Sequence, residues 1–286
     1  MWMKKLVEQA LHSHESGKRV VHPEPEKTNE DLPTMFVIGC GGAGCKAIQK
    51  IHERQIPGII TVAIDTDNRH LSAIIAHHKI PIGDPSVVGH GAGGFPEIGK
   101  KAAEESCAEI RTIITSAPYV FIVTGLGGGT GTGAAPVIAR IARKMGALVI
   151  VFGFWPFHVE KARERIANEG VNNLLLTADS VILLDNNKIS SYLPSIPIEQ
   201  VFTVQNVLVA ETIAALVDLF TAPPMDRCER AWEGPSPFHK LLGKSGLAVM
   251  LAGESFQQNF PESGVRECLS NPMFDIDYLT SPLCDS

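Results

Sequence analysis

The chain has 286 residues, which is enough for one large domain or two modest ones. Hydrophobic residues make up 44% and charged residues 20%, a balance typical of a folded globular protein and not of a disordered one. The net charge of -6 argues against nucleic acid as a partner, because a basic surface is what attracts a phosphate backbone. A phosphate group would therefore have to be bound by a local motif and not by a basic surface.

The cysteines and histidines give no sign of a metal site or a disulfide framework. The six cysteines include no CxxC pair, the nearest cluster of histidines, His70, His77, His78 and His90, shows neither HxH nor HExxH spacing, and no signal-peptide pattern precedes the fold. We therefore expect reduced thiols, a cytoplasmic protein and no protein-bound metal. The longest apolar runs, such as 148–154, fall well short of the roughly 20 residues that cross a bilayer, so no transmembrane segment is predicted.

Residues 1–33 form an N-terminal extension that differs from the rest of the chain. Apolar residues recur at helical spacing over 1–12, with two lysines beside them, and a polar, proline-containing linker follows over 22–31. The pattern predicts a short amphipathic helix. Docking of this helix on its own domain is favoured over peripheral membrane contact, because its apolar face is small and its basic residues are few.

From residue 34 to 197, apolar runs alternate regularly with helical patterns. This alternation is typical of a doubly wound α/β domain, a parallel sheet with helices on both faces. The expected strands are 35–38, 59–64, 119–123, 147–154 and 180–184, and the expected helices are 44–54, 98–115, 132–144 and 160–176.

A long helix and a short remainder are expected after this domain. Residues 198–221 have apolar side chains at helical spacing, and the helix is ended by Pro223 and Pro224. We interpret it as a central connecting helix. The remainder, 222–286, is too small for an independent domain and is expected to be a shortened C-terminal α+β part.

A first glycine-rich loop follows the first expected strand. Residues 39–44 read Gly-Cys-Gly-Gly-Ala-Gly and open a helix, so that backbone N–H groups and the helix N-terminus can face an anion. The loop also fits GxGxxG, and Asp65 or Asp67 could serve as the ribose-binding acid of a dinucleotide site. From this loop alone, a dinucleotide-binding site remains an alternative to a mononucleotide site.

A second glycine-rich loop favours a mononucleotide. Residues 125–133 contain six glycines with Thr130 and Thr132, and again lie between a strand and a helix, while a third glycine stretch covers 89–97. The lysine loop GxxxxGK[ST] does not occur in the sequence. Phosphate charge would therefore be met by backbone dipoles and by a Mg²⁺ ion bridging the phosphates.

With these motifs, the chain resembles the tubulin/FtsZ family of GTP-dependent cytoskeletal proteins from about Thr34 to about Asp275. The strongest match is 127–133, the signature of that family. The supporting matches are 39–44, 65–67, 89–99, 156–157 with Glu160, and 185–186.

The resemblance implies a guanine-nucleotide site for GTP or GDP. It assigns the α- and β-phosphates to Gly41, Gly42, Ala43, Gly44, Cys45, Gly127, Gly128, Gly129, Thr130, Gly131, Thr132 and Gly133. It further assigns Ala92, Gly93 and Gly94 to the γ-phosphate, Asp65 and Asp67 to the site, Glu160 and Arg163 to the ribose, and Asn186 and Phe202 to ribose and base. Asn206 lies near the family's guanine-reading position, but Val207 replaces an acid often found beside it in FtsZ.

The sequence departs from the family at the loop that follows the central helix. In FtsZ this loop supplies acidic side chains that reach the nucleotide of the next subunit and orient the attacking water. Here Gly234 and Pro237 fall at the two acidic positions, and neither can polarise water. Glu229 and Glu233 are close by but in another register, and we interpret them as solvated loop residues. We therefore expect GTP binding with slow or absent hydrolysis, and no confident catalytic residue.

The resemblance thus implies an FtsZ-like cytoskeletal protein that assembles with itself, as an oligomer or filament, in cell division or membrane remodelling. An alternative is a regulator that does not polymerise and caps filaments of a full-length FtsZ partner. A remote alternative is an NAD-dependent Rossmann enzyme, in which the second and third glycine loops would have no purpose.

Overall fold

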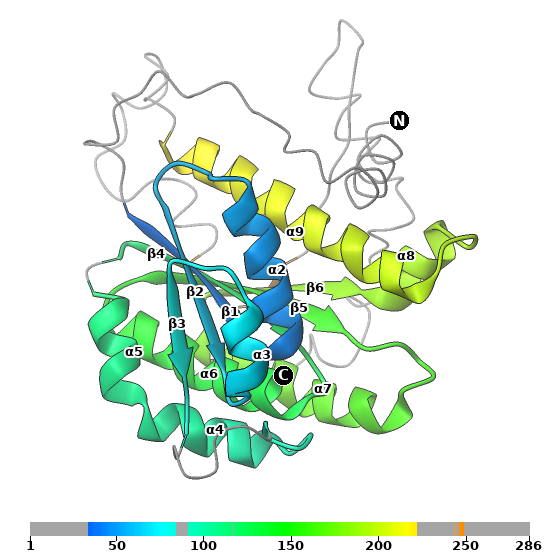
Figure 1. The fold of residues 1–286 in the computed structure, drawn as a ribbon, viewed down its shortest axis with the longest axis horizontal. Helices are drawn as coiled ribbons and strands as arrows, with labels where there is room; N and C mark the ends of the chain where they lie inside the picture. The colour runs from blue at the N-terminus through cyan, green and yellow to red at the C-terminus, as the bar shows by residue number, and fades with distance from the viewer. Residues whose placement is uncertain (1–33, 84–90, 116, 222–242, 244–245, 249–286) are drawn as a thin grey trace, which may run out of the picture.

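The computed structural model describes residues 34–83, 91–115, 117–221, 243 and 246–248 (Figure 1). The helix expected over 1–12 lies outside the described residues, as do Gly234 and Pro237. The domain boundaries expected at 34, 198 and 222 remain predictions.

The described strands form one seven-stranded parallel sheet in the order β3-β2-β1-β4-β5-β6-β7. The strands are β1 (Met35–Cys40), β2 (Ile59–Asp65), β3 (His78–Pro81), β4 (Tyr119–Gly125), β5 (Leu148–Trp155), β6 (Ser180–Asp185) and β7 (Leu247–Ala248). The chain winds outward in one direction from β1 and in the other from β4. The doubly wound parallel α/β fold expected from the sequence is confirmed.

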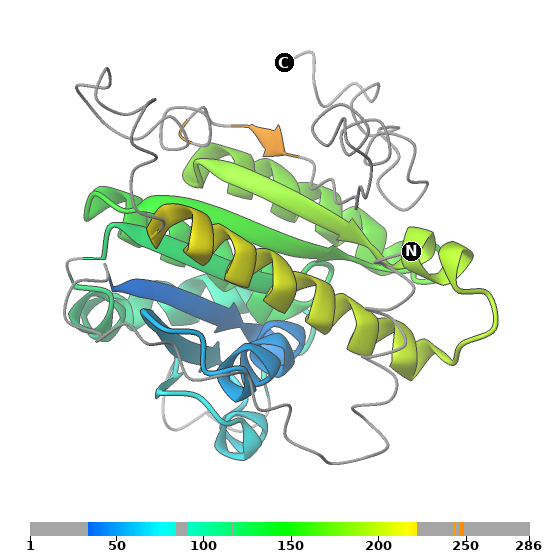
Figure 2. The same ribbon diagram turned by 90° about the horizontal axis from the view of Figure 1, so that it is seen from above.

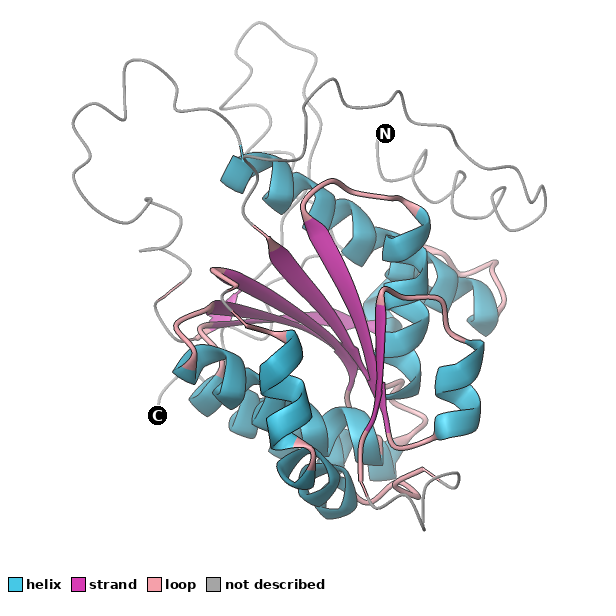
Figure 3. Cartoon of the chain, turned by 60° about the vertical axis from the view of Figure 1, so that its left-hand side comes forward, coloured by secondary structure: helices cyan, strands magenta, loops and turns pink. Residues whose placement is uncertain are grey.

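Helices cover both faces of this sheet (Figure 3). They are α2 (Gly41–Glu53), α3 (Asn68–Ala73), α4 (Pro96–Glu105), α5 (Cys107–Ile113), α6 (Gly129–Lys144), α7 (Lys161–Thr177), α8 (Asn186–Tyr192) and α9 (Ile198–Thr221). One face packs against α4, α5, α6 and α7, and the other against α2, α8 and α9. Every residue of β1 and β5 is buried, because strands covered on both faces cannot alternate apolar with polar side chains.

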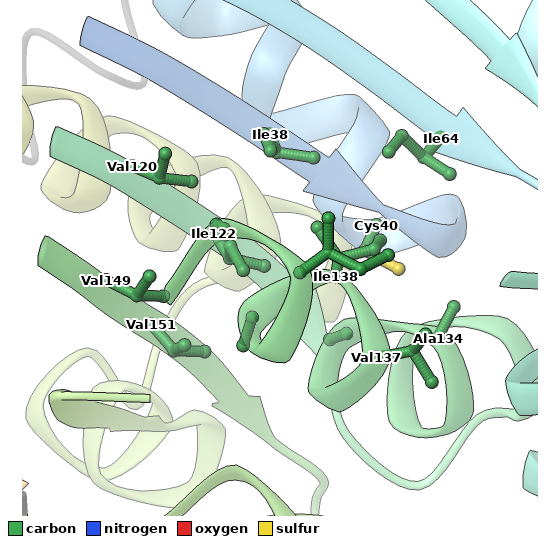
Figure 4. Close-up of a cluster of buried hydrophobic side chains, with 14 of the residues drawn as sticks. Ile38, Cys40, Ile64, Val120, Ile122, Ala134, Val137, Ile138, Val149 and Val151 are labelled. Atoms are coloured by element: carbon green, nitrogen blue, oxygen red, sulfur yellow. The ribbon is translucent and has the colours of Figure 1, made fainter. Parts of the chain in front are cut away.

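The side chains of the central strands β1, β4 and β5 alternate between these two cores. Figure 4 shows one of them, in which Ile38, Ile122 and Val151 from three neighbouring strands pack against Ala134 and Ile138 of α6. All five side chains are fully buried. This packing fixes α6 against the centre of the sheet, and with it the position of the glycine-rich loop at the start of that helix.

The helix expected over 98–115 is two helices, and that prediction was wrong. Helix α4 ends and α5 begins around Ser106, whose backbone leaves the helical range at φ -92° and ψ 14°. The Ser106 hydroxyl accepts a hydrogen bond from the backbone N–H of Gly83, at 3.2 Å. The break is confined to one residue, so the helical spacing of the apolar side chains does not reveal it.

Helix α9 lies across the face of the sheet beside α2 (Figure 2). In the described part of the chain it is the one helix whose length and composition would allow it to cross a membrane. Its buried residues, among them Val204, Leu208 and Ile213, pack into the core that β1, β4 and β5 also line. Arg54 at the end of α2 forms an ion pair with Glu211 at 2.6 Å. Core packing thus accounts for the buried apolar residues of α9, whereas Ile198, Phe202 and Leu219 are exposed.

At the end of the sheet away from the glycine loops, His52 and His77 share Thr61. The Thr61 N–H donates to Nδ1 of His77 at 3.0 Å, so this nitrogen has to be unprotonated. Burial, together with neighbouring His52 and then His78, lowers the pKa of His77. Neutral His77 contributes fully to the free energy of unfolding above the ordinary histidine pKa of about 6.5, which applies to the unfolded chain. This contribution is lost as the pH falls from there through the lower pKa of His77 in the folded chain.

We expect thermal stability to fall from pH 7 to pH 5 more steeply in the wild-type chain than in a His77→Gln variant. Glutamine gains no charge in this range, so the variant lacks this proton uptake on unfolding. Melting curves at half-unit pH steps measure the difference. Equal acid sensitivity of the two proteins would show that His77 titrates alike in the folded and unfolded chains.

Candidate functional site

The loops that follow β1 and β4 meet at the carboxyl edge of the sheet. The two strands are paired in parallel, with Cys40 opposite Thr124, and the chain turns in opposite directions after them. Gly41 has φ +71°, and a Cβ on it would lie 2.8 Å from the backbone N of Gly131. Such a crevice, where the strand order reverses, is where open α/β sheets bind ligands.

The N-termini of α2 and α6 both face this crevice. Each helix begins directly at its glycine loop, after Cys40 and after Gly128 respectively. Among the described residues, no side chain caps either helix and neither first turn contains an acid. The first N–H groups of both helices are therefore available to an anion, and the two helix dipoles add to their attraction.

The glycines of these loops fall into two groups. Some allow close packing: a Cβ on Gly44 would overlap the carbonyl oxygen of Val123, and one on Gly129 would lie 2.7 Å from the Cβ of Ala92. Others border open space, and a Cβ on Gly128 would meet nothing within 4 Å. The packed glycines hold the loops together, whereas Gly128 leaves the backbone accessible at the start of α6.

The third glycine stretch lies against the second. Buried Ala92 packs on Gly129, and the turn continues through Gly93 and Gly94 at φ +58° and +86°. A Cβ on Gly94 would again meet nothing within 4 Å. The structure thus brings together the three glycine segments that the sequence predicted at one site.

Both threonines of the signature loop are buried and hydrogen-bonded. Thr132 Oγ1 accepts from the N–H of Gly127 at 2.9 Å, and the Thr130 hydroxyl lies 2.6 Å from that of Thr66. The second bond joins the loop after β4 to the loop after β2, and the two partners are 64 residues apart. The pairing of Thr66 with Thr130 was not predicted, because no local pattern signals it.

Asp65 and Asp67 shape their own loop. The Asp65 carboxylate accepts from the N–H of Thr66 at 2.8 Å and lies 3.0 Å from Nδ1 of His70. Asp67 caps α3 by accepting from the N–H groups of Arg69 and His70. Both carboxylates therefore have partners inside the loop that follows β2.

Glu160 and Arg163 lie at the edge of the signature loop. A Cβ on Gly127 would be 2.7 Å from the Cβ of Arg163, so the start of α7 packs against the loop. Arg163 donates to Glu160 at 2.7 Å, and the other Glu160 oxygen accepts from the N–H of Phe157 at 3.2 Å. The carboxylate is thus fixed beside the glycine-rich loops.

Three further predicted residues offer groups suited to a base or a sugar. Asn186 is buried, and its Oδ1 has no hydrogen-bond partner among the described residues. Phe202 of α9 is 43% exposed and lies edge-on to Phe157, with 5.9 Å between ring centroids. Asn206 follows one helical turn later and is partly exposed. An unpaired buried acceptor and an open aromatic ring fit a ligand with N–H or O–H donors and a flat face.

The thiols beside the first loop are unreactive. Burial, then the neighbouring Cys45 and Asp65, raises the pKa of Cys40. Burial, then Asp65, likewise raises the pKa of Cys45 far above its ordinary value. Both thiols stay protonated near neutral pH in the structure as it stands, so neither serves as a nucleophile.

Comparison with known proteins identifies the family. The model of the tubulin/FtsZ family GTPase domain matches residues 34–194. The cell division protein FtsZ 2 of Halobacterium salinarum is 36% identical over 276 residues, covering 96% of this chain and 69% of that protein. FtsZ 2 of Haloferax volcanii is 37% identical over 278 residues, and the match covers 96% of this chain and 68% of that protein.

Solved structures agree with this assignment. An empty FtsZ dimer from M. jannaschii matches with a TM-score of 0.75 and 33% identity, covering 94% of this chain and 73% of that one. A GTPγS-bound protofilament of CetZ2 from Haloferax volcanii matches with a TM-score of 0.63 and 25% identity. The match covers 77% of this chain and 67% of that one. The chain belongs to the tubulin/FtsZ family, among relatives that include FtsZ cell division proteins.

Proposed function

We propose that this chain binds GTP or GDP at the carboxyl edge of the sheet and assembles with itself when GTP is bound. The observation that supports the proposal best is the meeting of two uncapped helix N-termini at the point where the strand order reverses. Membership of a family whose domain is described as a GTPase makes a guanine nucleotide the expected anion.

The phosphates would lie on the backbone of the glycine loops. The segments 41–45 and 127–133 would hold the α- and β-phosphates, and 92–94 would approach the γ-phosphate. Since Gly94 and Gly128 border open space, their backbone can be approached closely. A bound Mg²⁺ would neutralise part of the phosphate charge, and it needs few protein ligands because phosphate oxygens and water complete its shell.

The ribose and the base would lie on the opposite side of the signature loop. Glu160 and Arg163 would bond to the sugar hydroxyls. The unpaired Oδ1 of Asn186 would accept a hydrogen bond from the nucleoside, and Phe202 would offer its ring to the base. Asn206, one turn along α9 from Phe202, would read the polar edge of guanine.

Assembly into an oligomer or filament would use this same edge, in the cytoplasm and in cell division. Two of the matched structures bear titles that describe a dimer and a protofilament. Hydrolysis would be slow or absent, because Gly234 and Pro237 replace the acidic side chains that would orient water on a neighbouring subunit's nucleotide.

We expect GTP with Mg²⁺, but not GDP, to raise light scattering by the purified chain, and the rise to persist. Phosphate release should not exceed roughly 0.01 per second, about a hundredfold below the slow end of ordinary enzyme turnover. A double variant that carries Glu229→Gln and Glu233→Gln serves as the control. Its rate of phosphate release should equal that of the wild-type chain.

Other outcomes would contradict the proposal in distinct ways. Fast release that disappears in the Glu229→Gln and Glu233→Gln variant would show a displaced catalytic loop. Tight GTP binding without scattering, together with altered assembly of a full-length FtsZ, would favour a capping protein. Binding of NAD with no affinity for GTP would overturn the nucleotide assignment.

A further inference from the structure

A cluster of three potential metal ligands lies where β1 and β2 end. It consists of Cys45 in the first turns of α2, Asp65 at the end of β2 and His70 in α3, and their ligand atoms all lie within 4.8 Å of one another. The two strands are paired in parallel, with Cys40 opposite Ile64. Segments after neighbouring parallel strands meet at one edge of a sheet, which explains how residues 25 positions apart converge.

Hydrogen bonds hold the side chains of this cluster in place. Oδ1 of Asp65 accepts from the N–H groups of Thr66 and Asp67, at 2.8 and 3.3 Å. Its other oxygen lies 3.0 Å from Nδ1 of His70. The carboxylate is 5% exposed and the imidazole 26% exposed, so the pair can be reached from the His70 side.

The thiol of Cys45 is fully buried between backbone carbonyls. Its Sγ lies 3.6 Å from the oxygen of Gly39 and 3.6 Å from that of Ile64. A thiol has only one hydrogen, so it can donate to one of these oxygens at a time. Metal binding requires the thiolate, so the ion would have to release the thiol proton to solvent, and the burial of Cys45 adds to the cost of that step.

We infer that Cys45, Asp65 and His70 form a binding site for a divalent transition-metal ion of the Zn²⁺ type. Sulfur, nitrogen and oxygen ligands together suit Zn²⁺ or Co²⁺, whereas Mg²⁺ selects oxygen alone. Three protein ligands with a fourth position open is the arrangement of non-structural zinc sites.

The geometry requires only a small rearrangement. Metal–ligand bonds of 2.0 to 2.3 Å at tetrahedral angles give ligand–ligand separations of about 3.3 to 3.8 Å. The Asp65–His70 pair at 3.0 Å has to open slightly, and separations near the 4.8 Å limit have to close by roughly 1 Å. Side-chain rotation of the partly exposed His70 can supply this movement for the two separations that involve His70.

The site borders the first glycine loop. Cε1 of His70 lies 3.8 Å from the place where a Cβ on Gly42 would be. An ion here would be distinct from the Mg²⁺ proposed at the phosphates, because its ligands are side chains and not phosphate oxygens. The inference is independent of nucleotide binding, and it can be tested on the nucleotide-free protein.

Cobalt titration of the full chain without nucleotide is the direct test. We expect one Co²⁺ per chain to give a near-ultraviolet thiolate-to-cobalt charge-transfer band and the intense visible bands of a four-coordinate ion. Equimolar Zn²⁺ should abolish both signals, and a large excess of Mg²⁺ should not. A chain that shows no charge-transfer band with equimolar Co²⁺ would overturn the inference.

Variants then locate the ion. Cys45→Ser and His70→Gln should each lower Co²⁺ affinity at least roughly 100-fold, and Cys45→Ser should also remove the charge-transfer band. Cys107→Ser, which alters a partly buried free thiol outside the cluster, should keep both the affinity and the spectrum.

Circular dichroism melts establish that each variant folds, and His70→Gln, at a partly exposed position, offers a second route if Cys45→Ser is unstable. A charge-transfer band that survives in Cys45→Ser, or unchanged affinity in His70→Gln, would place the cobalt elsewhere. Failure of this site would leave the nucleotide proposal untouched.

Discussion

Replacing Gly128 by alanine is expected to lower the affinity for GTP roughly 100-fold, or about 2.7 kcal/mol, without changing thermal stability. Gly128 precedes α6 with φ -97° and ψ 175°, an extended backbone that alanine adopts freely. The added Cβ would meet nothing within 4 Å, so the fold should not resist it. The methyl group would stand before the first N–H groups of α6, where the proposed site needs a phosphate to approach.

Gly146→Ala is the matched control for this experiment. Gly146 lies just beyond the other end of α6, also with nothing within 4 Å of an added Cβ, but with φ +89°. Alanine there should lower stability by about 1 kcal/mol through backbone strain and leave GTP affinity unchanged. Isothermal titration and melting curves on both variants measure the two effects. If Gly128→Ala binds GTP as well as the wild type, the phosphates do not lie against this turn.

Replacing Gly133 by alanine is expected to destabilise the fold by about 3 kcal/mol. A Cβ at this position would overlap the carbonyl oxygen of Pro96 and lie 2.7 Å from the backbone N of Lys100. These are backbone atoms of α4, which cannot rotate away as a side chain could. Alanine would favour the helix itself by about 1 kcal/mol, so a net loss would show that packing of α4 against α6 decides the outcome.

Arg140→Ala is the control for this second substitution. Arg140 also joins α6 to α4, through an ion pair with Glu104 at 3.3 Å in which both side chains are nearly half exposed. Its loss should cost no more than about 1 kcal/mol, because water screens such a pair. Urea unfolding monitored by circular dichroism compares the two variants. A Gly133→Ala variant that unfolds at the wild-type urea concentration would show that α4 moves aside at no cost.

The central strands and their order of appearance were predictable from the sequence. Strands buried on both faces, such as β1 and β5, are continuous apolar runs, and the glycine loops after β1 and β4 lie between such runs and helices. The short elements α3, β3 and α8 were not predicted. In β3 only Ile80 of four residues is buried, so the strand produces no apolar run.

The candidate site was predictable to the extent that its motifs are local. Gly41, Gly128 and the signature loop could be assigned to phosphate binding because backbone N–H groups at a strand-to-helix turn are a property of a few consecutive residues. That placement still awaits the binding measurements on Gly128→Ala. Which glycines pack and which border open space depended on neighbours from other loops, such as Ala92 against Gly129.

Short-range sequence patterns therefore suffice to predict the fold class, the family and the loops expected to hold phosphate. Which distant groups meet becomes visible only in the folded chain. The order of the strands joins Thr66 to Thr130, and it brings Cys45 to Asp65 and His70 although their spacing matches no metal motif. Such contacts depend on which strands become neighbours, and strand pairing is settled by the packing of the whole domain.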